Sequence, residues 1–310
     1  MGKRQERDPK FEALETVFFD FCWEYGNDRI SLDEYNKYRG IYDKIRQRIM
    51  GASVGHDEIP PKYENMIQIP AGDFIMGSSK EEIKHLISEM VPKYPQFQLW
   101  FFEDEMPKRK ANLGTIWMDK FEVTNLQYSK FLSSQEGSSV TSPRSWDDRK
   151  VPPGKGNHPV TGVDKFQASA YCKFLGKRLP TEAEWEKAAR GTNGNIYTWG
   201  NNLSVRDVNT AEIGRHDTTE VGTMRDDVSP YGILDMGGNV MELVIDGYKP
   251  YPDNDAETEK AKRAFVDREG WAVARGSSYE GVLYDARGAN RRYFSPSHQG
   301  KDIGFRCTTD

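Results

Sequence analysis

The chain has 310 residues, a net charge of −5, 29% charged and 36% hydrophobic residues, and a mean hydropathy of −0.78. This length supplies one large domain or two small ones, and 7 Trp, 15 Tyr and 15 Phe supply bulky core material. The negative net charge argues against a basic surface that binds nucleic acid. No apolar run approaches the roughly 20 residues that a membrane-spanning helix needs.

Residues 1–50 are predicted to form a helical hairpin. Apolar residues recur at spacings of three and four from Phe11 to Tyr25, which is the period of one helical face. After a short turn, Ser31 and Glu34 form the capping box of a second amphipathic helix. The hairpin either packs on the main domain, which its large aromatic stripe favours, or docks a partner.

A linker is predicted over 51–62, because it contains two glycines and two prolines. The main domain is then predicted to span 63–310. It opens with two short strands, Met66–Pro70 and Asp73–Gly77, which flank a Pro-Ala-Gly turn. A helix is predicted over 80–91.

Further along, Leu113–Phe121 alternates apolar and polar residues and predicts a strand. Thr124 is the predicted N-cap of the next helix. Another helix is predicted over Val163–Leu175, with Phe166, Ala170, Tyr171 and Phe174 on one face. Thr181 and Glu184 form a capping box for the helix that follows. Beyond Gly191 we expect mainly loops and short strands.

Two aromatic segments allow two interpretations each. The stretch Tyr94–Phe102 is rich in aromatic residues and forms either an oligomer interface or part of the core. The loop 134–158 carries Trp146 beside Asp147-Asp148-Arg149. This tryptophan either contacts a substrate or anchors a solvated loop.

The three cysteines, Cys22, Cys172 and Cys307, are too few for a disulfide framework and have no C-x-x-C spacing. The five histidines are scattered, with no pair at helical i, i+4 spacing. These observations argue against a first-row metal site, so we expect neither copper nor iron.

The first residues, Met1–Asp8, are charged and lack the apolar stretch of a secretory signal. The sequence as written therefore predicts a cytoplasmic protein. An extracytoplasmic location follows instead if a signal peptide was removed and a start Met was added.

Five motifs follow one another in a fixed order, and together they carry a family resemblance. They are IPAGDFIMG (69–77), FEVTN (121–125), GKRLPTEAEWE (176–186), GGNVME (237–242) and GFRC (304–307). In this order the chain resembles the formylglycine-generating enzyme, or sulfatase-modifying factor, superfamily. The resemblance covers the main domain and implies an α+β, C-type-lectin-like fold, with helices around short twisted sheets and many loops.

The family's oxygen-dependent enzymes use two cysteines near the C-terminus, which bind copper(I) as soft thiolate ligands. No cysteine lies between Trp271 and Arg306 in this chain. Conversion of cysteine to formylglycine is therefore not expected. By resemblance, Cys172 and Cys307 occupy structural positions. Since neither has its usual disulfide partner here, both are predicted to be buried free thiols.

The resemblance also implies structural calcium, a hard cation that oxygen ligands suit. In the better-matched site, Asp235 and Glu242 would donate side-chain oxygens, and Gly238 and Val240 would donate main-chain carbonyls. The alternative is a turn in which Asp235 and Glu242 bond backbone amides without an ion.

A second calcium site of the family would involve Asn209 and the carbonyl of Thr210, with Asp217 as a candidate acidic partner. Near the missing cysteines, Arg287 and Arg291 match recurring arginines that buttress loops through bidentate bonds. Glu280 and Asp285 are a possible carboxylate pair for acid–base chemistry, whose separation the sequence does not give.

Two functions follow. The first is a non-catalytic binding or structural module, which presents the loops 134–158, 203–227 and 247–268 for recognition or docks in a larger assembly. Its partner would be a protein, bound through these loops or the N-terminal hairpin. The alternative is an oxidoreductase or tailoring enzyme with altered chemistry. Iron-dependent relatives take histidines from an added N-terminal domain, and here residues 1–60 hold only His56. The sequence does not decide between these two functions, and it does not give the oligomeric state.

Overall fold

The computed structural model describes residues 63–310, except 64, 96–97, 204–206 and 255–266. Residues Tyr63–Asp310 form one compact unit. The predicted hairpin over 1–50 and linker over 51–62 lie outside the described residues and stay predictions. Within the described part, no helix is both long enough and apolar enough to span a bilayer.

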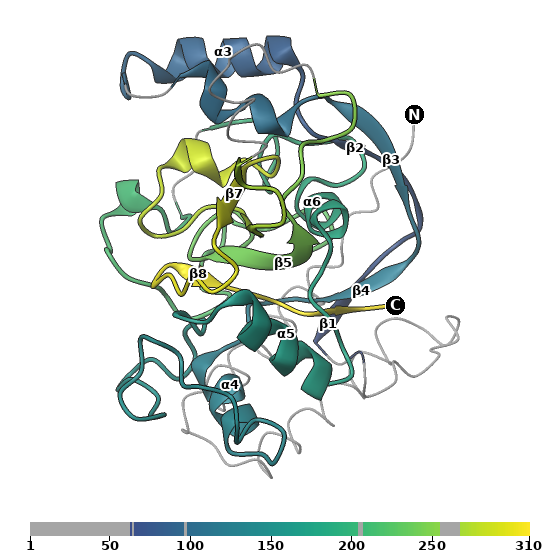
Figure 1. Cartoon of the computed structure of the whole chain (residues 1–310). Helices are drawn as coiled ribbons and strands as arrows, with labels where there is room; N and C mark the ends of the chain where they lie inside the picture. Colours follow the sequence, from purple (N-terminus) through teal and green to yellow (C-terminus); the bar gives the residue numbers. More distant parts are fainter. Residues whose placement is uncertain (1–62, 64, 96–97, 204–206, 255–266) are drawn as a thin grey trace, which may run out of the picture. The chain divides into compact units, whose positions relative to one another are not determined.

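Four capped helices carry the regular α structure of the described unit (Figure 1). They are α3 (Lys80–Met90), α4 (Asn125–Leu132), α5 (Lys165–Phe174) and α6 (Glu182–Arg190). Each begins with a complete capping box, on Ser79, Thr124, Asp164 and Thr181 respectively. The box satisfies amide groups that the first helical turn leaves unbonded, so short sequence signals fix where each helix starts. The predicted caps Thr124 and Thr181 are confirmed.

The strands are short and form separate small sheets. They are β1 (Met66–Ile69), β2 (Gly72–Met76), β3 (Arg109–Leu113), β4 (Ile116–Asp119), β5 (Met241–Gly247), β6 (Ala272–Arg275), β7 (Arg291–Phe294), β8 (Ile303–Gly304) and β9 (Thr308–Thr309). The sheets have the orders β1-β4-β9, β2-β3 and β7-β6-β5-β8. Only the β5–β8 pairing among them is parallel.

The single strand predicted over Leu113–Phe121 is wrong. Gly114 and Thr115 interrupt it, because β3 pairs with β2 whereas β4 pairs with β1 in another sheet. Alternation along a sequence reports a pleated segment, but it does not report which partner each part of the segment pairs with.

The domain has two main hydrophobic cores. They lie on opposite faces of strand β5 in the four-stranded sheet. One joins α4 and α5 through stacked and edge-on rings of Tyr128, Phe131, Tyr171 and Phe305. The other surrounds Trp185 of α6. Helix α3 packs at the far end from α4 and α5, on a cluster that includes Phe102 (Figure 1). The described part of the Tyr94–Phe102 segment therefore contributes to the core.

The predicted single face of helix α5 is wrong. Tyr171 is 4% exposed and lies in the core, whereas Phe166 is 66% exposed. Five residues correspond to a rotation of about 140° around an α-helix, so these two side chains cannot share one narrow face. Phe166 lies on the solvent side.

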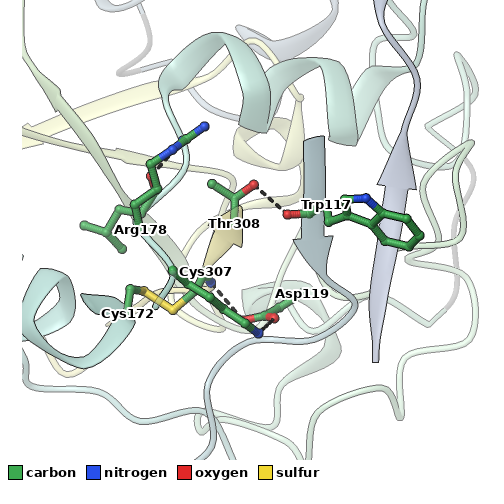
Figure 2. Close-up of a disulfide and its surroundings, with 8 residues drawn as sticks. Trp117, Asp119, Cys172, Arg178, Cys307 and Thr308 are labelled. Atoms are coloured by element: carbon green, nitrogen blue, oxygen red, sulfur yellow. Dashed lines mark hydrogen bonds and ion pairs between the residues drawn. A yellow bond between two sulfur atoms is a disulfide. The ribbon is translucent and has the colours of Figure 1, made fainter. Parts of the chain in front are cut away.

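A disulfide joins Cys172 on α5 to Cys307 in the C-terminal segment (Figure 2). Our prediction of two free thiols is thus wrong, although both residues are fully buried as expected. Their Cα atoms lie 5.6 Å apart although 135 positions separate them in the chain. One backbone bond and one side-chain bond hold the C-terminal segment beside the disulfide. Asp119 N–H donates to the Cys307 carbonyl over 2.9 Å, and Cys307 N–H donates to the Asp119 side-chain oxygen Oδ2 over 3.0 Å.

A buried network of ion pairs connects α6 to β6 and β7. Arg275 donates to Glu186 Oε2 over 2.6 Å and to Glu182 Oε2 over 3.0 Å. Arg291 donates two hydrogen bonds to the Glu182 carboxylate, over 2.7 and 2.8 Å, and Arg190 forms an ion pair with Glu186. Burial alone would raise the pKa of Glu182, but Arg291 and Arg275 hold it below its usual value.

The disulfide predicts a measurable loss of stability when it is removed. Cys172→Ala combined with Cys307→Ala should lower the free energy of unfolding by roughly 2–5 kcal/mol, because the unfolded chain regains the freedom of a long closed loop. Urea unfolding of the variant and of the reduced wild type should agree. Thiol titration that finds both cysteines free in the native, non-reduced protein would contradict the pairing.

The buried network predicts that Arg275→Met destabilises the protein by roughly 3–5 kcal/mol, because the Glu186 and Glu182 carboxylates lose a partner in a dry interior. Urea unfolding measures this loss. Arg225→Met, at an exposed position, serves as the matched control and should change stability little. A loss at Arg275 equal to that of the control would show that the network is not required.

Candidate functional site

The two segments with predicted calcium ligands lie against each other. Asn239 N–H donates to the Asn209 carbonyl over 2.9 Å. A Cβ on Gly238 would come within 2.8 Å of the same carbonyl oxygen, so only glycine allows this approach. The amides of Gly237 and Gly238 both donate to the buried Asp227 carboxylate, over 2.8 and 2.9 Å. Asp227, whose pKa burial raises to about 6, is thus the organising residue of this turn.

Asp235 and Asn209 each keep a buried oxygen without a hydrogen-bond partner. One oxygen of Asp235 accepts from Gly222 N–H, whereas Oδ1 is unpartnered. Burial and the neighbouring Asp227 raise the pKa of Asp235 to about 7. Asn209 donates through Nδ2 to the Asp217 carbonyl over 3.0 Å, and its Oδ1 is unpartnered. Oxygens of this kind suit a hard cation.

Glu242 and Thr210 are already engaged elsewhere. Arg306 binds both carboxylate oxygens of Glu242, over 2.6 and 2.7 Å, and Trp185 Nε1 adds a bond of 2.8 Å. The Thr210 carbonyl accepts from Ile213 N–H over 3.1 Å. The structure therefore places the two predicted calcium segments side by side, but Glu242 and the Thr210 carbonyl are bonded to other groups. Calcium at this turn stays a prediction.

Sequence reasoning missed Glu122 as a member of this region. It is fully buried, accepts from Asn239 Nδ2 over 2.9 Å and keeps Oε2 unpartnered. Burial and the nearby Asp235 raise its pKa well above the usual value. Its position in the FEVTN motif was a signal, since a glutamate between apolar residues in a buried motif needs a partner. Across the described residues, His, Cys, Asp and Glu side chains nowhere gather in threes as metal ligands.

A cleft of about 170 Å³ opens directly after β6, in the segment where the family resemblance places the catalytic thiols. Its walls are formed by Met241, Gly276, Ser277, Ser278, Glu280, Gly281, Asp285, Asn290, Arg292 and Asp302. Among the lining residues, Gly276 has φ +78°, and a Cβ there would lie 2.7 Å from the Met236 carbonyl oxygen. The backbone therefore runs tightly over the core at this point.

The arginines predicted to buttress loops do so beside the cleft, which confirms that prediction. Arg287 binds Glu105 with bonds of 2.5 and 2.8 Å, and Arg291 binds Glu182. Asn290 Nδ2 donates to the Gly276 carbonyl over 3.2 Å and connects two residues that line the cleft. These side chains are buried, so bonds inside the protein fix the position of the cleft walls.

The polar side chains of the cleft are largely paired. Asp285 meets Arg292 at 2.7 Å, and Glu280 meets Lys301 at 2.6 Å. Glu280 and Asp285 thus line one cleft, but each carboxylate has its own cation, which argues against an acid–base pair. Ser278 Oγ donates to Asp302 Oδ2 over 3.1 Å. The lining contains no thiol and no imidazole.

Trp146 does not reach this cleft's lining. It is 8% exposed in the α4–α5 core, and its Nε1 donates to Asn125 Oδ1 over 2.9 Å. Arg149 of the same loop donates to the carbonyls of Leu132 and Val140, each over 2.6 Å. The tryptophan is therefore the anchor of the loop, the second of its two interpretations.

Curated relatives match most of this chain. It is 27% identical to YfmG of Bacillus subtilis, over 95% of this chain and 63% of that protein. It is 30% identical to serine/threonine-protein kinase pkn1 of Chlamydia pneumoniae, over 85% and 41%. It is 28% identical to the formylglycine-generating enzyme of mouse, over 81% and 76%. The chain thus spans less than two thirds of the length of the first two.

Solved structures share the fold. PvdO from Pseudomonas aeruginosa superposes with a TM-score of 0.55 at 22% identity, over 78% of this chain and 93% of that one. Treponema denticola variable protein 1 gives a TM-score of 0.56 at 20% identity, over 78% and 94%. The predicted α+β, C-type-lectin-like fold of the formylglycine-generating-enzyme type is confirmed. Residues 53–310 match the family described as sulfatase-modifying factor enzyme 1-like domain. The chain therefore belongs to the sulfatase-modifying factor family.

Proposed function

We propose that this chain is a non-catalytic recognition module that binds a protein partner within a larger assembly. One observation carries the proposal: the cleft after β6 is lined by serines, an asparagine and ion-paired carboxylates, without a thiol. Copper(I) oxidation of a cysteine needs soft thiolate ligands, which these side chains do not replace. Hydroxyl, amide and carboxylate groups are instead suited to hydrogen bonding with a ligand.

The rigidity of the walls supports binding. Arg275 donates to the Gly288 carbonyl over 2.9 Å, and Arg287 donates to the Tyr284 carbonyl over the same distance. Both arginines are buried and paired with glutamates, so they hold the segment in one conformation. A site that is already ordered pays less entropy when a ligand binds.

The disulfide supports the extracytoplasmic alternative for the location. Disulfides persist in oxidising compartments, whereas the cytosol keeps thiols reduced. Cys172 and Cys307 are fully buried, and their pairing closes about half of the family domain into one loop. We propose that the chain works outside the cytoplasm on this ground.

Calcium at the Asp227–Glu242 turn is a second part of the proposal. In the first site, Asp235 would supply a side-chain oxygen, and Gly238 and Val240 would supply main-chain carbonyls. A second site would involve Asn209 and the Thr210 carbonyl. When bound, the first ion would neutralise the buried Asp235 carboxylate. Glu242 would act indirectly, since Arg306 holds both of its oxygens.

The recognition role predicts no turnover. The purified chain, incubated with copper(I), oxygen and a short peptide that contains one cysteine, should leave the peptide mass unchanged. A formylglycine-generating enzyme serves as positive control. Elemental analysis of the natively purified protein should find no near-stoichiometric copper or iron. Conversion of the peptide would overturn the recognition role and favour the alternative, an oxidoreductase of the same family.

In the absence of calcium, the raised pKa of Asp235 predicts a pH-dependent stability. Folding raises the pKa of this carboxyl to about 7 through burial and Asp227, so the folded state holds a proton that the unfolded state has released. Its contribution is fully present below about pH 4 and is lost as the pH rises through about 7, at roughly 1.4 kcal/mol per pH unit for one proton. Asp235→Asn should flatten this slope in urea unfolding.

Millimolar calcium should raise the melting temperature at about pH 8 more than at about pH 5, because protons compete with the ion for Asp235. The calcium effect should disappear in Asp235→Asn and persist in Asp253→Asn, an exposed control. Chelation should reverse it. An unchanged melting temperature at both pH values would mean that Asp235 binds no calcium.

A further inference from the structure

We infer that Glu122, and not Glu242, is the second carboxylate that binds the calcium ion proposed at Asp235. This inference rests on the calcium part of the proposed function and replaces one residue of the ligand set that the family resemblance implies. It starts from two buried oxygens without a hydrogen-bond partner, Glu122 Oε2 and Asp235 Oδ1. Both residues are 1% exposed, so bulk water does not satisfy these oxygens.

Hydrogen bonds place the two carboxyl groups side by side. Leu234 N–H donates to the Lys120 carbonyl over 3.1 Å, and these residues stand just before Asp235 and Glu122 in the chain. Arg306 connects the same two segments, because it donates to the Lys120 and Leu234 carbonyls over 3.0 and 2.9 Å. The carboxyl groups of Glu122 and Asp235 are in hydrogen-bonding contact. Two ionised carboxylates have no hydrogen to share, so this contact requires a positive ion, either a proton or a metal cation.

The other oxygen of each carboxylate is already fixed by an amide group. Asn239 Nδ2 donates to Glu122 Oε1 over 2.9 Å, and Gly222 N–H donates to Asp235 Oδ2. Donors of this kind orient metal-binding carboxylates from outside the coordination sphere and leave the second oxygen for the ion. The pair is thus ordered before an ion binds.

The charge balance favours a divalent cation over a shared proton. Glu122 and Asp235 carry two negative charges when both are ionised, and one shared proton removes only one of them. A calcium ion matches both charges and accepts several oxygen ligands, main-chain carbonyls included. Glu242 is already neutralised by Arg306, which binds both of its oxygens over 2.6 and 2.7 Å. Binding of Glu242 to the ion would leave this buried arginine without its partner, which is costly.

Calcium binding by the chelator-treated full chain at about pH 8 tests this assignment, measured by isothermal titration calorimetry. Glu122→Gln keeps the size of the side chain and gives Asp235 an amide donor in place of the ion. We expect this variant to bind calcium about tenfold more weakly or worse, and to lose the calcium-induced rise in melting temperature. Glu136→Gln, the same change at an exposed position, is the matched control and should bind calcium like the wild type.

A crystal structure of the wild-type chain grown with calcium chloride tests the geometry even if Glu122→Gln fails to fold. We expect an ion about 2.3–2.6 Å from Glu122 Oε2 and Asp235 Oδ1, with Glu242 still bound to Arg306. An ion held by Asp235 and Glu242 without Glu122, or equal calcium affinity of Glu122→Gln and the wild type, would overturn the assignment while calcium at this turn stands. A wild type that binds no calcium would overturn the calcium proposal and the assignment together, whereas the turnover assay tests the recognition role separately.

Discussion

The buried arginine–glutamate pairs between helix α6 and strands β6 and β7 are the interaction on which the rest of the unit depends. Glu182 and Glu186 lie one turn apart on α6, and Arg275 reaches both from the sheet. A buried charge that loses its partner costs several kcal/mol, so the helix and the sheet have one acceptable register. Trp185 packs between them and adds apolar burial to the same contact.

The same network of buried ion pairs fixes the backbone on both sides of the cleft. Gly276 follows Arg275 directly, and the segment beyond it is held again where Arg287 meets Glu105 and where Arg275 meets the Gly288 carbonyl. The pairs inside the cleft are more exposed than these anchors: the side chain of Arg292 is 33% exposed, whereas that of Arg275 is fully buried. The residues that stabilise the unit and the residues that line the cleft are thus largely different, so a cleft side chain can change while the buried ion pairs remain.

What the sequence could predict was local, and what it could not predict depends on distant partners. The capping boxes at Thr124 and Thr181 act within one helical turn, so their residues are visible in a short window. The disulfide joins positions 135 apart, and no spacing rule connects Cys172 with Cys307. Glu242 was expected beside an ion for the same reason: its partner Arg306 lies 64 positions away, in another motif.

The buried arginine–glutamate network does not decide which chemistry the cleft carries. Two thiolates would make the site a ligand for a soft, redox-active ion, whereas hydroxyls and carboxylates make it an acceptor for hard cations and hydrogen-bond donors. The buried arginine–glutamate pairs do not depend on that choice, because neither the arginines nor the glutamates of these pairs line the cleft. The fold therefore does not imply the activity of its enzymatic relatives, and the function follows from the few side chains that line the cleft.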